Sequence, residues 1–567
     1  MIQSFVYAGS SAVVRQGDAR LIRFAPNLAR EPVSFDADLA HPLRFREAIS
    51  ALHDVVVSDL RFAKKDKTAY LEWKKQQAAR EAAVRREAYR QADQRSGTLF
   101  AIPLPAGFER EYDAARKHYW DARNTYSRYL ALHDPDLWRK LLPADPIITV
   151  ADDVVFFECF SKDESAYGHL SVGRGDGFGA SSSLQLGTTN VDYSQDLYEQ
   201  FQTLRTYRKT RFNLDPEGFT VRTGEAQVHR EEKIDLPTSW LRGLMKLQAA
   251  MTMPTTRVRL TREVVYSLLA FLKRNKARKS PRALRFELEP GQPVRLVLEP
   301  WEKRFEATGT TYDGPATPPI RIWGTRRLLV LARLLPLADS IDVCLLATGL
   351  PSFWLVRMGE MTFTLGLSGW TTNDWSAGSA LDLLQPPRAP STQLIDRTAA
   401  VLQSRRAADL ATVKRETSES DDYLGAAALR HLAQTGQVIY DLGTGVYRYR
   451  QIMSHPLGEA QLGPEDPELA GARQLIAKGK VELIDRQDGP NLTRVIVGKV
   501  EGKPVEILLE PDDRIRRGKC LCGHFKKYGL RNGPCRHMIA LRWGTSVHGL
   551  RALEASGAIN QALGRPG

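Results

Sequence analysis

Near its C-terminus the chain places three of its five cysteines within sixteen residues, in the stretch CLCGHFKKYGLRNGPCRHMIALRW. The pattern is Cys-x-Cys, twelve intervening residues and Cys-x-His, which provides the candidate ligands Cys520, Cys522, Cys535 and His537. Residues two apart on an extended segment point the same way, so the first two cysteines can grip one ion. Structural zinc sites are tetrahedral and take four sulfur or nitrogen ligands. The spacing therefore predicts one structural Zn²⁺, with no open position for a catalytic water.

Local signals favour metal binding over the two alternatives, which are free core cysteines and a disulfide. Gly533 and Pro534 predict a turn followed by a helix, which places Cys535 near the helix N-terminus. There the helix dipole and Arg536 favour the thiolate form of cysteine, and the thiolate is the form that binds metal.

The order Cys-x-Cys, spacer, Cys-x-His and apolar helix (GPCRHMIALRW) resembles the SWIM zinc finger. Just upstream, TRVIVGKV and PVEILLEP flank the turn EGK and predict a β-hairpin, which fits the usual ββα shape of that family. The resemblance covers residues 490–545. It implies contact with DNA or with another protein.

Two phrases of the central region, FECFSKDESAYGHL and SGWTTNDWS, are similar to phrases of large bacterial SWIM proteins. Proteins of that kind tend to be encoded beside MoxR-type AAA+ ATPases and von Willebrand A-domain proteins. The resemblance implies an adaptor in an ATP-driven assembly, in which a partner carries out the nucleotide chemistry.

The length of 567 residues is enough for three or four domains, and a hydrophobic content of 43% is ordinary for globular protein. The formal net charge of +14 favours polyanionic partners without identifying one. The N-terminus lacks the positive start and apolar core of a secretory signal, and no run approaches about 18 uncharged apolar residues. We expect a soluble cytoplasmic protein with no membrane contact, in which Cys159 and Cys344 are reduced core residues.

Changes in composition along the chain predict an α+β multidomain protein. Residues 1–55 alternate weakly and predict a small β-rich cap. Residues 56–140 predict a long helical hairpin, because a run rich in Ala, Glu, Lys, Arg and Gln is broken at Pro103 and Pro105 before a helical period resumes. We expect the hairpin to dock on a partner, and an arm that binds nucleic acid is the alternative.

Residues 147–385 predict a β-rich domain with an internal repeat. The segments 256–308 and 320–368 each read as a strand, a helix and three strands, so two βαβββ units are expected. A degenerate third copy precedes them, around LQLGTTNVDYSQDL. Duplicated βαβββ units are similar in element order to sliding-clamp and TATA-binding-protein-like domains, a likeness of fold that does not decide function.

After the Pro-rich stretch LLQPPRAPST, residues 393–451 predict three short helices and a two-stranded wing, which together resemble a winged helix. Such folds often bind DNA through the third helix. Here that helix begins with acidic residues, including Asp421 and Asp422, which would repel phosphates. The wing offers Arg448 and Arg450 for contact with a nucleic-acid backbone, but we favour protein contact for this module.

Two classes of function follow. The first is a non-catalytic zinc-binding adaptor that mediates protein–protein contacts. The second is a DNA- or RNA-binding protein, with Tyr528 as a stacking surface and with basic residues around the finger, namely Lys526, Lys527, Arg531, Arg536 and Arg542. An enzyme with an unrecognised site is a minor alternative, because the chain has no H-E-x-x-H, G-x-S-x-G or Walker sequence. We predict that the protein is not an enzyme.

Overall fold

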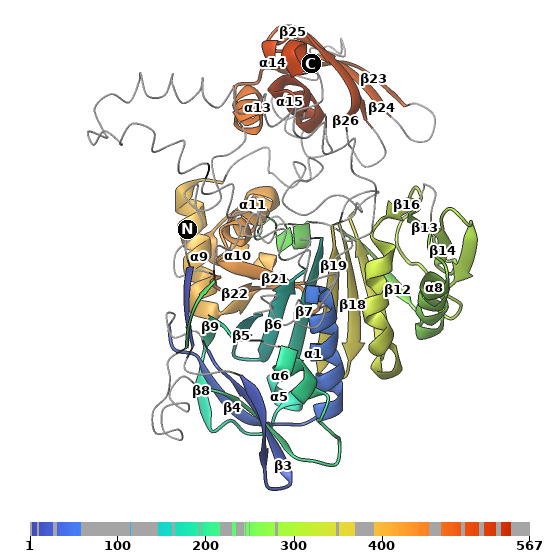
Figure 1. Ribbon diagram of the computed structural model, residues 1–567. Coiled ribbons are helices and arrows are strands. Elements are labelled where there is room, and N and C mark those ends of the chain that lie inside the picture. Colours follow the sequence, from blue (N-terminus) through green and yellow to red (C-terminus); the bar gives the residue numbers. More distant parts are fainter. Residues whose placement is uncertain are drawn as a thin grey trace. The chain divides into compact units, whose positions relative to one another are not determined.

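The computed structural model describes most of residues 3–57, 146–215, 229–233, 243–277, 282–346, 351–368, 390–452 and 467–545, with short gaps inside these ranges. Almost all of the helical hairpin predicted for residues 56–140 lies outside the described residues. The described part is mixed α/β and contains several sheets (Figure 1). Within it, no helix is both long enough and apolar enough to cross a membrane.

The largest sheet of the described residues has eight strands, and all neighbours in it are antiparallel. In order across the sheet they are β12 (Thr256–Leu260), β17 (Ser340–Leu345), β18 (Ser352–Met358), β19 (Met361–Leu367), β7 (Ala166–Gly173), β6 (Val154–Phe160), β5 (Ile147–Val150) and β9 (Gly187–Asn190). The pairing of β19 with β7 joins strands almost two hundred residues apart into one layer.

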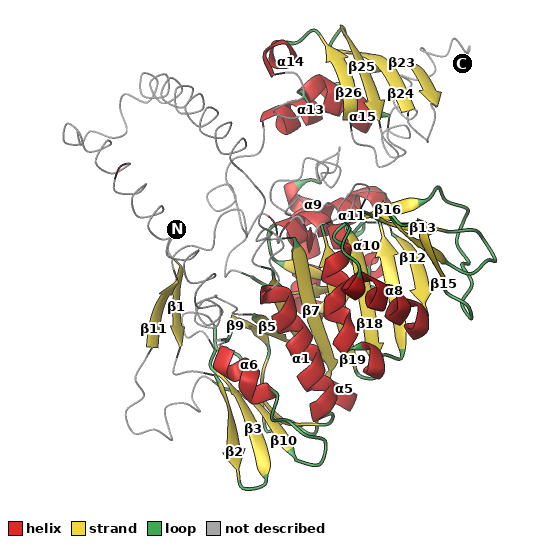
Figure 2. Ribbon diagram, turned by 45° about the vertical axis from the view of Figure 1, so that its right-hand side comes forward, coloured by secondary structure: helices red, strands yellow, loops and turns green. Residues whose placement is uncertain are grey.

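Helices cover one face of this sheet (Figure 2). They are α1 (Pro42–Val57), α6 (Gln195–Phe201), α8 (Arg262–Arg274) and the 3-10 helix η2 (Thr325–Arg333). Successive strand residues point to opposite faces, so Val155 and Phe157 of β6 join the core under α1 while Phe156 and Glu158 face the other way. Gly168 of β7 is required there, because an added Cβ would lie 2.9 Å from Leu52 Cδ1 of α1.

The element order expected for the two repeat units is present. The first unit continues from β12 and α8 into β13 (Leu284–Glu287), β14 (Arg295–Leu298) and β15 (Lys303–Glu306), and the second runs from β16 (Ile320–Ile322) through η2 to β17, β18 and β19. Each unit lends its first strand to the other, because β12 pairs with β17 and β16 pairs with β13. The helix of the second unit is 3-10 rather than α, and Pro336 interrupts its predicted run. Superposition of the two units stays a prediction.

The N-terminal strands do not form a separate cap. The sheet order is β2 (Ala12–Gln16), β3 (Ala19–Phe24), β10 (Thr210–Leu214), β4 (Ser34–Leu39) and β8 (Ser183–Gln185). Strand β1 (Gln3–Tyr7) likewise pairs with β11 (His229–Lys233). Half-buried strands need neighbours for their backbone N–H and C=O groups, and residues 183–214 supply them. Between β9 and β10, α6 occupies the place of the degenerate third copy.

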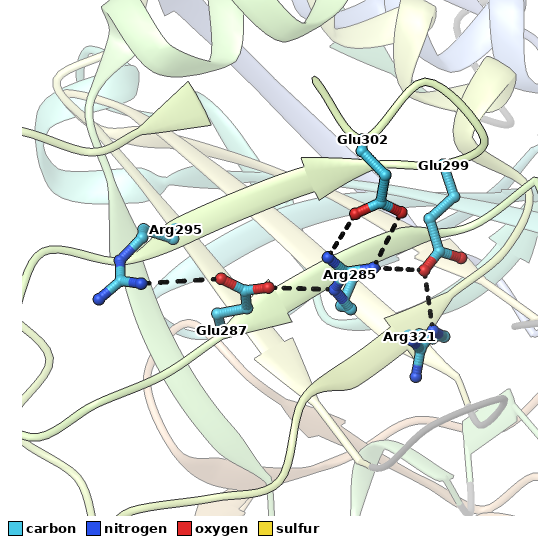
Figure 3. Close-up of polar contacts among 6 residues, drawn as sticks. All are labelled: Arg285, Glu287, Arg295, Glu299, Glu302 and Arg321. Carbon is cyan, nitrogen blue, oxygen red and sulfur yellow. Dashed lines mark hydrogen bonds and ion pairs between the residues drawn. The ribbon is translucent and has the colours of Figure 1, made fainter. Parts of the chain in front are cut away.

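The outer face of the four-stranded sheet β15-β14-β13-β16 is a network of ion pairs (Figure 3). Leu284 and Phe286 of β13 are buried, and Arg285 between them points outward. Arg285 donates to Glu299 at 2.7 Å and to Glu302 at 2.8 Å, and it holds the pKa of Glu302 below its usual range. Arg321 donates to Glu299 and Arg295 pairs with Glu287, so opposite charges alternate across the strands and support the solvated face of the sheet.

Three helices and a hairpin lie where the winged-helix-like module is predicted. They are α9 (Thr392–Arg405), α10 (Leu410–Thr417), α11 (Asp422–Gln434), β21 (Val438–Asp441) and β22 (Val446–Tyr449), with the two-residue strand β20 (Ala407–Ala408) on the free side of β22. Each helix begins at a side-chain cap, which Ser391, Asp409 and Asp421 provide. The likeness to a winged helix stays an interpretation.

The two wing arginines are buried against the large sheet, so the prediction that they contact nucleic acid is wrong. Arg450 is fully buried and its Nη2 donates to Glu158 Oε1 at 2.7 Å. Arg448, 4% exposed, donates to both carboxylate oxygens of Asp153, at 2.6 and 3.0 Å, and to Asp441 at 3.1 Å. The guanidinium groups therefore hold the hairpin β21–β22 on the sheet, where phosphates cannot reach them.

The remaining free cysteines behave as the sequence predicts. Cys159 and Cys344 are buried and unbridged. Burial in apolar surroundings raises the pKa of each thiol, so both are inert core residues.

We predict that the substitution Arg450→Met lowers the free energy of unfolding by about 3–5 kcal/mol, because it leaves the Glu158 carboxylate buried without its cation. Urea unfolding measures the loss. The control is Arg405→Met in the same module, which removes the exposed pair of Arg405 with Glu416 and should have a much smaller effect. Adding Glu158→Gln to Arg450→Met should recover much of the loss. Equal effects of the two single variants would contradict the buried pair's role.

Candidate metal centre

The four predicted ligands lie in one folded unit of the described residues, which we call the C-terminal unit (467–545). Its elements are α13 (Pro467–Ala477), β23 (Val481–Asp488), β24 (Arg494–Val500), β25 (Lys503–Leu509), β26 (Ile515–Cys520), α14 (Gly523–Tyr528) and α15 (Arg536–Gly544). The strands form one antiparallel sheet in chain order. The predicted hairpin is thus β24–β25, and the predicted apolar helix is α15.

Each ligand stands where one element ends or begins. Cys520 is the last residue of β26 and pairs with Val505 of β25. Cys522 follows two residues later, before α14, and its Sγ accepts the backbone N–H of Phe525 at 3.4 Å. Cys535 is the N-cap residue of α15, and His537 lies in the first turn of that helix. The strand end and the helix start therefore bring the two halves of the motif together.

Two glycines let α15 lie close to the sheet. At Gly498 of β24 an added Cβ would lie 2.5 Å from Leu541 Cδ1 and 2.5 Å from the carbonyl oxygen of Glu482. At Gly518 of β26 it would lie 2.7 Å from Met538 Cε. Real Cβ atoms do not approach so closely, so a larger residue at either position would force Leu541 or Met538 of α15 to repack, and at Gly498 it would also clash with the backbone of β23.

The four ligand atoms all lie within 4.8 Å of one another, and all four residues are buried. A tetrahedral zinc–thiolate site places its sulfurs about 3.8 Å apart, so ligand atoms this close together can surround one ion. Every ligand comes from the protein, and the set leaves no position for substrate or catalytic water. Cys520, Cys522, Cys535 and His537 can thus hold a single metal ion in a closed site.

Hydrogen bonding within the cluster divides the thiols by charge. A hydrogen bond from Cys535, together with the nearby imidazole of His537, lowers the pKa of Cys520 to about 4 against the opposing effect of burial. The hydrogen bond with Cys520 raises the pKa of Cys535 well above the usual range. Without metal, the two thiols therefore titrate as a coupled pair, in which the proton of one sulfur stabilises the thiolate of the other.

The imidazole of His537 has one nitrogen free to bind metal. Its Nδ1 is buried and has no hydrogen-bond partner among the described residues. Its Nε2 lies 3.5 Å from Glu501 Oε2 and 3.4 Å from Lys503 Nζ. An orphaned nitrogen beside three thiols fits a ligand atom of a soft metal ion.

The described basic residues predicted for nucleic-acid binding differ in their exposure to solvent. Lys526 and Lys527 are exposed on α14. Arg536 pairs with Glu468 of α13 at 2.9 Å and is 42% exposed, whereas Arg542 is only 4% exposed. Arg531 and the side chain of Tyr528 lie outside the described residues. Arg448, Arg450 and Arg542 are thus removed as phosphate contacts.

Sequence reasoning missed two elements of this unit and two of its acids. The unit begins at α13, upstream of residue 490, and β23 adds a fourth strand. Pro467 at the helix start and Gly479 just past its end are signals that could have identified α13. Glu468 and Glu501 have no such signal, because their partners Arg536 and His537 come from far along the chain.

Comparisons with known proteins identify no family. No family model and no curated protein matches the chain. Among solved structures, proliferating cellular nuclear antigen from Entamoeba histolytica is 11% identical with a TM-score of 0.28, and the match covers 40% of this chain and 88% of that one. A PCNA2–PCNA3 complex from Sulfolobus tokodaii is 7% identical with a TM-score of 0.28, covering 40% and 89%. Scores this low carry no argument about this protein.

We predict that metal affinity rises with pH. The metal-bound cluster holds at least one proton fewer than the free cluster, because cysteine binds metal as the thiolate and the metal displaces the proton that the coupled thiols keep, so a lower pH favours the metal-free form. The apparent affinity for Zn²⁺ should rise by about tenfold per pH unit for each proton released. Competition with a chromogenic chelator between about pH 6.5 and about pH 8 measures it. An affinity that is constant across this range would contradict proton displacement.

Proposed function

We propose that the protein is a non-catalytic adaptor whose Cys₃His centre binds one structural Zn²⁺ and thereby holds a SWIM-type finger in the shape that docks another protein. The observation that carries the proposal is the closed, buried ligand set of Cys520, Cys522, Cys535 and His537. A site with no open coordination position can stabilise a fold but cannot activate a water molecule or polarise a substrate.

Small units of this kind depend on the metal. The core of the C-terminal unit includes the three cysteines themselves, packed with Met538, Leu541 and the inward residues of the sheet. A core of this size supplies little stability alone, and the free energy of zinc binding becomes folding free energy. Zinc is preferred because three thiolates and one imidazole are its usual structural ligands.

The burial of arginines favours a protein partner over nucleic acid. Three of the basic residues that could have neutralised phosphates, Arg448, Arg450 and Arg542, have their guanidinium groups inside the fold. The second candidate function, binding of DNA or RNA, draws its support from charge. Residues 490–545 contain twelve Lys and Arg against five Asp and Glu, and Lys526 and Lys527 are exposed.

The resemblance to large bacterial SWIM proteins supports a more specific setting, which we also propose. In it the protein works in the cytoplasm beside a MoxR-type AAA+ ATPase and a von Willebrand A-domain protein. The ATPase would supply the nucleotide chemistry, and this chain would join the components.

The test is affinity capture of the full-length chain from its native host, followed by mass spectrometry, with the Cys535→Ser variant as a matched bait. We predict that the wild type retains a defined set of proteins after nuclease treatment and in about 0.5 M salt, and that the variant loses this set. A partner set that disappears with nuclease would contradict the adaptor role. Binding of duplex DNA that weakens by several decades as salt rises would instead support the nucleic-acid function.

A further inference from the structure

The turn between β24 and β25 carries a residue that suits its backbone poorly. Val500 pairs directly with Lys503, so Glu501 and Gly502 alone form the turn. Both have positive φ, 51° for Glu501 and 72° for Gly502. Two-residue turns with positive φ at both positions favour Asn-Gly, Asp-Gly or Gly-Gly, because a longer side chain there crowds its own carbonyl group. The backbone conformation of the turn therefore does not explain why a glutamate occupies its first position.

The Glu501 side chain reaches the metal centre. Its Oε2 lies 3.5 Å from Nε2 of His537, and the other ring nitrogen is the buried Nδ1 without a hydrogen-bond partner. The backbone N–H of Glu501 donates to the carbonyl oxygen of Lys480 at 2.8 Å, which fixes the turn beside the start of β23. Gly or Asn would satisfy the backbone better, but neither could extend a carboxylate as far as the imidazole.

The other group near this nitrogen is a lysine. Lys503 Nζ lies 3.4 Å from His537 Nε2 and 3.1 Å from Glu501 Oε2. A lysine ammonium can only donate, so a hydrogen bond from Lys503 to Nε2 would put the ring proton on Nδ1, facing the thiols. Once Nδ1 binds metal, Nε2 carries the proton, and of these two side chains only the carboxylate can accept it.

We propose that Glu501 is the positioning residue of the metal centre: its carboxylate accepts the Nε2–H of His537 and so fixes the ring orientation and the tautomer that presents Nδ1 to the metal. The present separation of 3.5 Å is close to hydrogen-bond distance. Glu501 is 53% exposed at the side chain, which leaves it room to adjust. Carboxylates behind metal-binding histidines have this role in metal sites generally.

A second glutamate of the chain combines a positive φ with a defined partner for its carboxylate. Glu302 also has positive φ, 48°, in the turn between β14 and β15. Its carboxylate is likewise committed to a neighbouring side chain, the guanidinium of Arg285. In both turns a glutamate stands at an unfavourable backbone position where its carboxylate has a defined partner.

The inference rests on metal binding by the proposed site, and four full-length variants test it. Glu501→Gly removes the carboxylate and relieves the backbone strain, and Glu501→Gln keeps the length and a weaker acceptor. Lys503→Met removes the competing donor. Glu506→Gln is the matched control, because Glu506 is an acid of the same hairpin whose carboxylate pairs with Lys519 at 3.2 Å. Zn²⁺ affinity is measured by chelator competition, and Co²⁺ spectra report ligand geometry.

We expect Glu501→Gly to lose about 10- to 100-fold in Zn²⁺ affinity, with altered ligand-field bands in the Co²⁺ spectrum. Glu501→Gln should fall between this variant and the wild type, and Glu506→Gln and Lys503→Met should bind as the wild type does. A purely structural turn predicts the opposite sign, because glycine suits the positive φ and should leave affinity equal or higher.

Three results would overturn the assignment. One is wild-type affinity in Glu501→Gly, and another is a loss in Lys503→Met as large as that in Glu501→Gly. The third is an equal loss in Glu506→Gln, which would show a general effect of charge. If the wild type itself bound no Zn²⁺, the proposed function would fail, whereas a wild type that binds Zn²⁺ no better than Glu501→Gly would refute this inference alone.

Discussion

Four soft ligands buried within 4.8 Å of one another are the constraint on which the C-terminal unit depends. Three thiols and an imidazole are not an ordinary apolar core, because sulfur ligands this close compete for protons when no cation is present. The hydrogen bond between Cys520 and Cys535 shifts the pKa values of these two thiols in opposite directions. A divalent metal resolves this competition by replacing protons with one charge that all four ligands share. The glycines beneath α15 and the turn at Glu501 serve the same geometry from opposite sides.

The large sheet is stabilised mainly by burial of apolar surface. Charged pairs fix the winged-helix-like module to it. One face is buried under α1 and α8. On the other face, Arg450 of the hairpin reaches Glu158, whose carboxylate also accepts hydrogen bonds from Tyr167 and Gln248. Breaking such a pair is costly, because the remaining charge has no water to solvate it. The winged-helix-like module therefore uses its arginines within the fold.

The features that could be predicted from the sequence are those that depend on residues close together in the chain. The ligand set, the hairpin β24–β25 and the three helices of residues 392–434 were readable, because local spacing, turn residues and caps encode them. The exchange of first strands between the repeat units was not readable, since pairing between β12 and β17 joins residues more than eighty positions apart. The burial of Arg448 and Arg450 could not be predicted either. The alternation of residues along a strand shows which face a side chain occupies, but not which element packs against that face. The sequence indicates Glu501 only as a turn residue, because its partner His537 lies far along the chain in α15.

Hydrogen exchange with and without metal tests the central claim, that one metal ion holds the C-terminal unit together, most directly. The full-length protein is loaded with Zn²⁺, and its amide exchange is compared by mass spectrometry before and after chelation, with Cys535→Ser alongside. The account predicts that chelation removes protection from β24, β25 and α15, while β6, β7, β18 and β19 keep theirs. It also predicts that the variant resembles the chelated wild type. Unchanged protection in α15 after chelation, or an equal loss across the large sheet, would contradict it.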